Sequence, residues 1–148
     1  MRYELRRAET AEELAAMHRM RRDVLFAARG RAGVYNDAHP DDAASNHLKF
    51  LLMLDGEPVG TARLDLVQGM GKLRLVVIVP EHQRRGHGAA MEQLIAEHAY
   101  GLGITTLLVN SAPDAVGFYE KRGWQRELWD AGELQGMASD CVQMAKYL

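Results

Sequence analysis

The sequence VVIVPEHQRRGHGA, residues 76–89, decides the fold of this 148-residue chain. It opens with a run of branched aliphatic residues, which is typical of a buried strand, and Pro80 ends that run. Gly86 and Gly88 follow, and apolar residues then recur at helical spacing from Met91 towards Gly101. The stretch therefore predicts a strand that passes through a tight turn into the N-terminus of a helix.

This turn is predicted to bind an anion. The first N–H groups of a helix have no partner within the helix, and the aligned peptide dipoles place partial positive charge there. A phosphate can therefore accept several hydrogen bonds at once. Gly86 and Gly88 let phosphate oxygens approach the backbone, because they lack a β-carbon, and Arg84 and Arg85 can neutralise the charge of a phosphate.

Two other phosphate-binding turns are excluded by the sequence. A P-loop requires Gly-Lys followed by Ser or Thr, and this tripeptide does not occur in the chain. The dinucleotide-binding fingerprint requires a third glycine, where this chain has Met91. It also requires an acidic residue at the end of the next strand, where this chain has Asn110.

The turn instead resembles the Q/R-x-x-G-x-G/A motif of the GNAT superfamily of N-acetyltransferases, with Gln83, Gly86 and Gly88 at the defining positions. A second match lies downstream, where FYEKRGW, residues 118–124, is similar to the F-Y-E-K-x-G-F helix end of the family. Residues 58–63, PVGTAR, resemble the third strand of a branch of small bacterial GNAT proteins. The resemblance covers residues 48–148.

The resemblance implies an α+β fold with a mixed central sheet of six to seven strands, about four helices, and fourth and fifth strands that splay apart. The residue pattern also argues against an all-parallel sheet, because an antiparallel hairpin across Asp55-Gly56 precedes a strand–helix–strand unit. With no repeat or linker, we expect residues 1–148 to form a single domain. The predicted strands lie near Tyr3 and Leu5 and at 48–54, 59–66, 73–79, 105–109, 124–129 and 140–147, and the predicted helices at 10–30, 88–101 and 115–122.

The resemblance further implies that acetyl-CoA is the cosubstrate, with its pantetheine between the splayed strands and its pyrophosphate at the turn. Tyr119 matches the general acid of the family, which gives a proton to the departing thiolate. His87 is expected to contribute through its backbone rather than its imidazole. The residues that the resemblance places at the cofactor are Val76, Val77, Ile78, Gln83, Arg84, Arg85, Gly86, His87, Gly88, Ala89, Asn110 and Tyr119.

The general base is not identified by this pattern. Many relatives carry a glutamate on the fourth strand, but that strand here holds Lys72 and Arg74 and no carboxylate. Asp65, His47, Glu127 and a bound water remain alternatives. Arg74 suggests a substrate that carries a carboxylate or a phosphate.

Composition and charge exclude several classes of protein. The chain is 47% apolar and 26% charged, with a net charge of −2, so nothing attracts it globally to nucleic acid. A single cysteine, Cys141, excludes an internal disulfide and a thiolate metal cage, and the Asp- and His-rich segment 37–47 lacks metal-ligand spacing. No apolar run reaches the ~20 residues of a membrane helix, and no signal peptide is found, so we expect a cytoplasmic protein that binds neither metal nor membrane.

The expected function is transfer of an acetyl group from acetyl-CoA to a primary amine, on a small molecule or a peptide, by direct attack. Two alternatives stay open. One is a non-catalytic acyl-CoA-binding module, favoured by the missing glutamate, and the other is an interaction protein that does not bind the cofactor. A homodimer through the last strands would be usual for the family.

Overall fold

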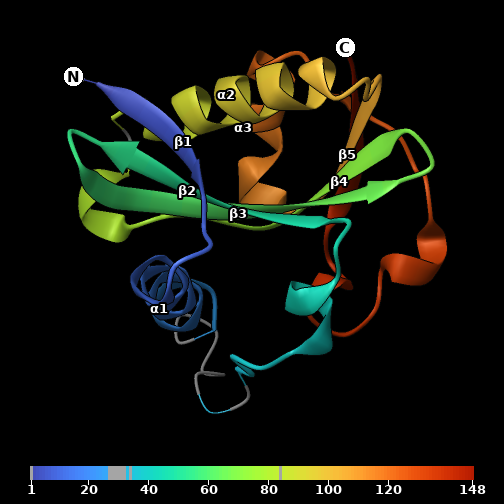
Figure 1. Cartoon of the computed structure of the whole chain (residues 1–148). Helices are drawn as coiled ribbons and strands as arrows, with labels where there is room; N and C mark the ends of the chain where they lie inside the picture. Colours follow the sequence, from blue (N-terminus) through green and yellow to red (C-terminus); the bar gives the residue numbers. More distant parts are fainter. Residues whose placement is uncertain (1, 27–32, 34, 84) are drawn as a thin grey trace.

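The computed structural model describes residues 2–26, 33, 35–83 and 85–148. Its centre is a seven-stranded mixed sheet with the order β1-β2-β3-β4-β5-β7-β6 (Figure 1). Neighbouring strands are antiparallel except for β4 and β5, which are parallel. The strands are β1 (Tyr3–Arg7), β2 (His47–Leu54), β3 (Glu57–Val67), β4 (Met70–Ile78), β5 (Thr106–Ser111), β6 (Gln125–Arg126) and β7 (Val142–Tyr147). The predicted α+β class is confirmed.

Helices cover both faces of the sheet. Helix α1 (Ala11–Met20) lies below the sheet in Figure 1, whereas α2 (His87–Gly101) and α3 (Val116–Lys121) lie above it. Three α-helices are found in the described part of the chain, instead of the predicted four or so. The predicted first helix changes form, because its second half is a π-helix, η1 (Arg21–Phe26), and residues 27–30 lie outside the described residues.

Helix α1 begins where the sequence places a cap. The Thr10 hydroxyl accepts a hydrogen bond from the Glu13 N–H at 3.1 Å, and the Glu13 carboxylate accepts one from the Thr10 N–H at 3.0 Å. This reciprocal pair satisfies N–H groups that the first turn leaves without partners.

Two apolar cores follow from the alternation of side chains along the strands. On β2, Phe50 and Leu52 pack in the core that includes α2 and α3, while Leu51 and Met53 pack in the core that includes α1. Because both faces of the central strands are covered, β2 is a nearly continuous apolar run rather than an alternating one.

Tight turns set the hairpins. Asp55 and Gly56 have φ values of 51° and 88°, which confirms the turn predicted between β2 and β3. A second turn, Gln68-Gly69, has φ values of 51° and 80°, so β4 begins at Met70, three residues before the predicted start. Gln-Gly was missed because glutamine is not among the residues that favour positive φ.

The last predicted strands are shorter than expected. Strand β6 comprises only Gln125–Arg126 of the predicted 124–129. The chain leaves the sheet because the Gln143 Oε1 atom accepts hydrogen bonds from the N–H groups of Trp129 and Asp130, both at 2.8 Å. A side chain thus takes the place of a neighbouring strand for these groups.

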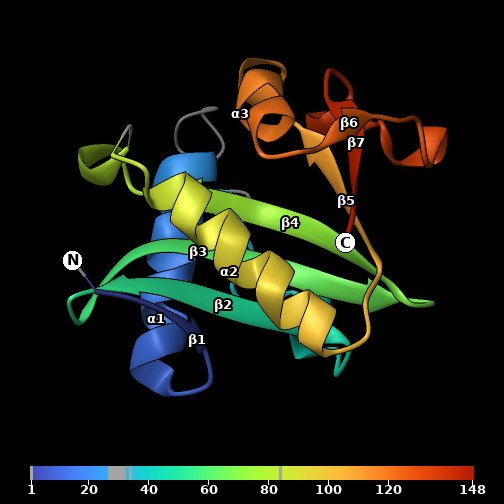
Figure 2. The same cartoon turned by 90° about the horizontal axis from the view of Figure 1, so that it is seen from above.

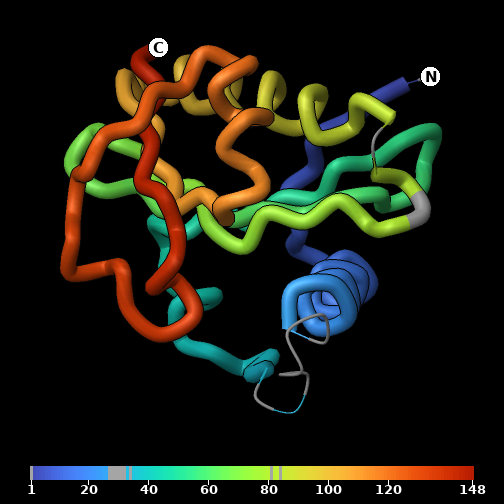
Figure 3. The backbone as a smooth tube through the Cα atoms, turned by 180° about the vertical axis from the view of Figure 1, so that it is seen from behind, coloured from blue at the N-terminus to red at the C-terminus, as the bar shows by residue number. Residues whose placement is uncertain are grey.

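The predicted splay of the fourth and fifth strands is confirmed. Strands β4 and β5 pair only from Met70–Leu73 with Thr106–Val109, and residues 74–78 of β4 have β3 on one side and no strand on the other. Figure 2 shows β5 diverging from β4. Figure 3 shows the same opening from behind, between the green-yellow trace of β4 and the orange trace of β5.

A β-bulge lies where the splay begins. Thr61 pairs with Val77 and Arg63 with Arg74, so one residue of β3 faces two of β4, Leu75 and Val76. Leu75 has φ of 52°, in the left-handed region that L-residues rarely adopt. Strain of this kind in a strand next to a cavity is typical of a functional site.

Candidate active site

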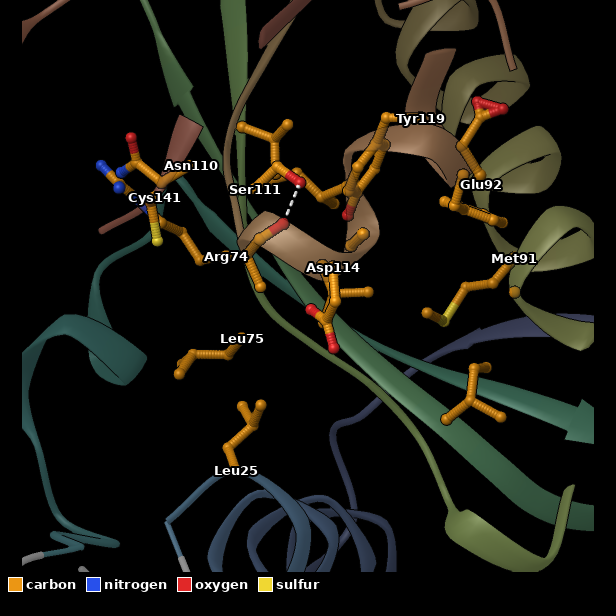
Figure 4. A pocket seen from close by; sticks show the side chains of 18 of the residues that line it. Leu25, Arg74, Leu75, Met91, Glu92, Asn110, Ser111, Asp114, Tyr119 and Cys141 are labelled. Atoms are coloured by element: carbon orange, nitrogen blue, oxygen red, sulfur yellow. Dashed lines mark hydrogen bonds between the residues drawn. The ribbon is translucent and has the colours of Figure 1, made fainter. Parts of the chain in front are cut away.

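A cavity of about 650 Å³ occupies the opening between β4 and β5. Its walls come from β4, β5, α2 and α3, together with residues of η1 and of the segment before β7. Figure 4 shows Leu25 rising from the side of η1, Met91 on α2 and Tyr119 on α3. The cavity therefore lies where the family resemblance places pantetheine.

The N-terminus of α2 lies at one end of this cavity. Gly86 is the N-cap with φ of 84°, a left-handed conformation that explains why glycine is needed, and no side chain caps the helix. Gln83 and Gly88 line the cavity, and the Gln83 amide donates to the Ile78 carbonyl at 2.8 Å. No side chain thus occupies the first N–H groups of α2, and the anion site predicted at this turn stays a prediction.

Of the other predicted residues at this turn, Arg85 is exposed, Ala89 lies half-buried in the first turn of α2, and Arg84 lies outside the described residues. The imidazole of His87 is turned away from the turn. It is 2% exposed, and its Nδ1 atom lies 2.6 Å from the Tyr3 hydroxyl on β1. Its side chain therefore joins α2 to the sheet, and a contact between the His87 backbone and the cofactor stays a prediction.

On β4, the side chains of Val76 and Ile78 line the cavity, and that of Val77 packs on the opposite face in the core with α1. The alternation of a strand explains this difference. The backbone groups of residues 74–78 on the side of β5 have no strand partner, so they can bond a ligand as a neighbouring strand would.

Tyr119 is buried at the inner end of the cavity. It is 5% exposed, and its ring packs edge-on against Phe118 and Trp124 at centroid distances of 5.2 and 5.1 Å. Burial raises the pKa of the Tyr119 hydroxyl, and the charge of Glu92 raises it further. Figure 4 shows the hydroxyl pointing into the cavity, and within the described residues it makes no hydrogen bond. The Tyr119 hydroxyl therefore keeps its proton near neutral pH and directs it into the cavity.

Asn110 lies at the cavity wall, but both ends of its amide are engaged. Its nitrogen donates to the Glu133 carboxylate at 3.2 Å, and its oxygen accepts from the Gln143 amide at 3.0 Å. Glu133 also accepts from Lys72 at 2.7 Å and from Arg74 at 2.6 Å. The amide nitrogen still has a second N–H and the oxygen a second lone pair, so Asn110 can keep both partners and also bond a ligand.

Sequence reasoning missed Glu133, which lies 59 residues from Arg74 in a segment without a motif. Burial alone would raise the pKa of its carboxyl, but hydrogen bonds from Arg74 and Lys72 outweigh that effect and lower the pKa to about 2. Glu133 is thus a charged anchor between β4 and the chain beyond β6, not a proton acceptor.

This pKa predicts how stability depends on pH. Because the folded-state pKa of Glu133 is about 2, below the ordinary glutamate value of 4.5, its stabilisation is complete above pH 4.5 and is lost as the pH falls towards 2. Glu133→Gln should lower the free energy of unfolding by about 1 kcal/mol at neutral pH. In urea titrations, the gap between the two proteins should shrink as the pH falls below 4.5. A gap that widens in acid would contradict the assignment, and Glu97→Gln on the surface of α2 controls for the lost charge.

The sequence candidates for the general base are not brought into this cavity. Asp65 accepts from Arg63 at 2.7 and 3.0 Å, and His47 bonds the Asp41 carbonyl at 2.6 Å. Glu127 accepts from the Tyr147 hydroxyl at 2.6 Å. No sequence motif marks Asp114, which follows β5 and, in Figure 4, points its carboxylate into the cavity.

A second cavity of about 470 Å³ adjoins the first one, and the two share Phe26, Arg74 and Leu75 in their walls. The bulged residue Leu75 therefore lies at their junction. The rest of the second wall is mainly polar and charged, and part of it comes from the described residues of the predicted loop 30–47.

No described helix is long and apolar enough to cross a membrane. Across residues 2–26, 33, 35–83 and 85–148, no three His, Cys, Asp or Glu side chains are grouped so that they could hold a metal ion.

Comparisons with known proteins agree with this geometry. A family model described as an acetyltransferase (GNAT) domain matches residues 31–148. The uncharacterized N-acetyltransferase YjcF of Bacillus subtilis is 30% identical over 96 residues, which are 62% of this chain and 69% of that protein. A mycothiol acetyltransferase of Nocardiopsis dassonvillei is 34% identical over 83 residues, 55% of this chain and 25% of that protein.

Solved structures show the same fold. The PaiA N-acetyltransferase of Thermoplasma acidophilum, solved with coenzyme A, has a TM-score of 0.74 at 18% identity, and all of both chains is covered. The ribosomal-protein-S18-alanine N-acetyltransferase of Escherichia coli has a TM-score of 0.75 at 17% identity, with 99% of this chain and 94% of that chain covered. The chain belongs to the GNAT family of acetyltransferases, as its glycine turn and its FYEKRGW segment indicate, and it is an N-acetyltransferase that uses acetyl-CoA.

Proposed function

We propose that the protein transfers the acetyl group of acetyl-CoA to a primary amine by direct attack in the opening between β4 and β5. One observation carries this proposal: an unpaired stretch of β4, residues 74–78, borders a cavity that extends from the uncapped N-terminus of α2 to Tyr119. The relative that acts on the alanine of ribosomal protein S18 supports an amine as the acceptor, on a small molecule or a peptide.

The residues present fit the cosubstrate. The backbone of Gly86 to Ala89 offers N–H groups to the pyrophosphate, and Gln83 and Arg85 flank it. The free edge of Val76 to Ile78 pairs with the amides of pantetheine, and Asn110 lies on the facing strand. Bound acetyl-CoA supplies an activated thioester carbonyl.

The chain then positions the reacting atoms. The amine nitrogen forms a bond to the carbonyl carbon while the carbon–sulfur bond breaks, and the electron pair leaves with sulfur. An amide N–H of β4 stabilises the charge on the carbonyl oxygen. Tyr119 donates its proton towards the departing sulfur, and Asp114 accepts the proton of the amine. Glu92 also lines the cavity, but Arg122 and Lys146 pair with it at 3.1 and 2.9 Å, so it is not the proton acceptor.

Two measurements test the proposed function. Coenzyme A should raise the melting temperature, and acetyl-CoA should release free thiol when an amine from a panel of small amines, amino acids and peptides is added. A rise in melting temperature without thiol release for any amine would instead indicate a binding module. No rise at all would indicate an interaction protein.

Gly88 offers a sharper test of where the cosubstrate lies. A β-carbon there would lie 3.5 Å from the Phe118 ring, so the position tolerates a side chain, but a larger one fills the cavity next to the α2 N-terminus. Gly88→Leu should raise the KM for acetyl-CoA about tenfold or more while the protein stays folded. Ala90→Leu, on the same helix but outside both cavity walls, is the matched control. Equal KM values for the two variants would place the cosubstrate elsewhere.

A further inference from the structure

The second cavity has an excess of positive charge away from its rim. Three arginines line it together with the buried Asp65 and the half-buried Asp42, so one positive charge is left without a counterpart among these five. Asp41 also lines the cavity, but its side chain is 56% exposed at the rim. Glu133, which binds Arg74 from outside this cavity, is itself balanced by Lys72. The charged residues are Arg21, Arg63, Arg74, Asp42 and Asp65.

The aspartates of this cavity are already satisfied by the chain. Asp42 accepts from Arg21 at 2.8 Å and from Arg63 at 3.3 Å, and Asp65 accepts from Arg63 at 2.7 Å. Burial would raise the pKa of Asp42, but these two arginines outweigh that effect and lower it, so Asp42 stays charged. A cationic group would therefore find only the exposed carboxylate of Asp41 at the rim, whereas an anion would find free donors inside.

The free donors belong to Arg21. This side chain is 1% exposed, and its Nη1 atom bonds the Asp42 carboxylate and lies 3.4 Å from the Tyr35 hydroxyl. Its Nε and Nη2 atoms are buried and have no hydrogen-bond partner among the described residues. Two unpaired N–H groups on a buried guanidinium are costly, and such orphaned groups in a folded protein require an explanation.

The geometry of these two atoms indicates their ligand. Nε–H and one N–H of Nη2 point in parallel along one edge of the planar guanidinium, which matches the two oxygens of a carboxylate. Arg21 begins the π-helix η1, and Phe26 of the same helix lines both cavities. Short π-helices are frequent at functional sites.

We propose that the second cavity binds the amine acceptor through a carboxylate, and that the free edge of Arg21 receives it. The acceptor is then an amino acid or another amine that carries a carboxylate. This inference rests on the proposed function, because the amine must reach the thioester across the shared wall of Phe26, Arg74 and Leu75. Both nitrogens are shielded from water in this structure, so the surrounding side chains must shift to admit the carboxylate.

The test compares free amino acids with their own carboxamides, which keep the shape and lose the charge. The wild-type enzyme should use the acids with a kcat/KM about tenfold or more above that of the amides. Arg21→Met should bring this ratio close to one, and Arg21→Lys, which keeps the charge but not the two-pronged edge, should give an intermediate ratio. Arg19→Met on the exposed side of α1 is the matched control and should keep the wild-type ratio.

A second readout does not depend on turnover. With coenzyme A present, amino acids should bind the wild-type protein in a calorimetric titration and should bind Arg21→Met about tenfold or more weakly, while coenzyme A stabilises both proteins equally. If Arg21→Met does not fold, Arg21→Lys carries the same comparison.

The outcomes separate this inference from the proposed function. If amines and amides are acetylated as well as acids, the carboxylate site is wrong and the acetyltransferase activity stands. If no amine is acetylated but the amino acids still bind through Arg21, the proposed function fails and the site stands. If the enzyme prefers an aminoalkyl phosphate to every amino acid, the proposed carboxylate specificity is wrong. It is also wrong if Arg21→Met keeps the wild-type ratio of kcat/KM for acids to that for amides.

Discussion

Replacing Tyr119 by phenylalanine is expected to lower kcat by about tenfold to a thousandfold with little change in the KM for acetyl-CoA. Coenzyme A leaves as a thiolate, and a thiol pKa of about 8.5 makes this a tolerable but not an easy leaving group near neutral pH. Because burial and the charge of Glu92 raise the pKa of Tyr119, its proton is present throughout the working range of pH and lies on the cavity side. Removing the hydroxyl removes that donor and nothing else.

The structure makes this variant a clean one. The Tyr119 hydroxyl has no hydrogen-bond partner in the described part of the chain, so its loss leaves no buried polar group unsatisfied and the melting temperature should not fall. The measurement is thiol release under saturating acetyl-CoA, with Tyr100→Phe, at a tyrosine that is 67% exposed, as the matched control. Unchanged kcat in Tyr119→Phe would remove the tyrosine from the reaction, and the leaving thiolate would then be protonated by water.

Features that depend on a few neighbouring residues could be predicted from the sequence. The turn at Gln83 to Ala89, the Asp55-Gly56 hairpin and the Thr10–Glu13 cap each follow from local backbone chemistry, and each lies where it was expected. The family resemblance added the splay of β4 and β5, which local pattern alone does not predict.

Features that depend on distant residues could not be predicted. Glu133 reaches Arg74 and Lys72 only because the chain after β6 folds back across the sheet, and no periodicity marks it. The bulge at Leu75 results from a register shift against β3, and the sequence offered a plain aliphatic strand there. Arg21 lies in a predicted helix, but the burial of its guanidinium depends on how that helix packs against the loop that carries Asp42.

The base candidate Asp65 shows how a long-range contact changes an interpretation. From sequence, it was one of the alternatives for the general base, beside His47, Glu127 and a bound water. In the structure it is 5% exposed and bonds Arg63 twice, with Arg74 and His47 each at 3.6 Å. Asp65→Asn should therefore lower the free energy of unfolding by about 3 kcal/mol, because Arg63, itself 8% exposed, loses the closer of its two charged partners and keeps only Asp42 at 3.3 Å.

Urea unfolding at neutral pH measures this loss, and Asp55→Asn is the matched control. Asp55 has φ of 51° in a surface turn, where asparagine is as well suited as aspartate, so the same chemical change there should stay within about 0.5 kcal/mol. If Asp65 were the general base instead, Asp65→Asn would lower turnover and leave the free energy of unfolding unchanged. If Asp65→Asn unfolds like the wild type but no longer acetylates the amine, Asp65 is the general base after all. If Asp65→Asn loses stability, adding Arg63→Met should restore part of it, because the double variant leaves neither charge unpaired. That result would establish Asp65 as the buried counter-ion of Arg63.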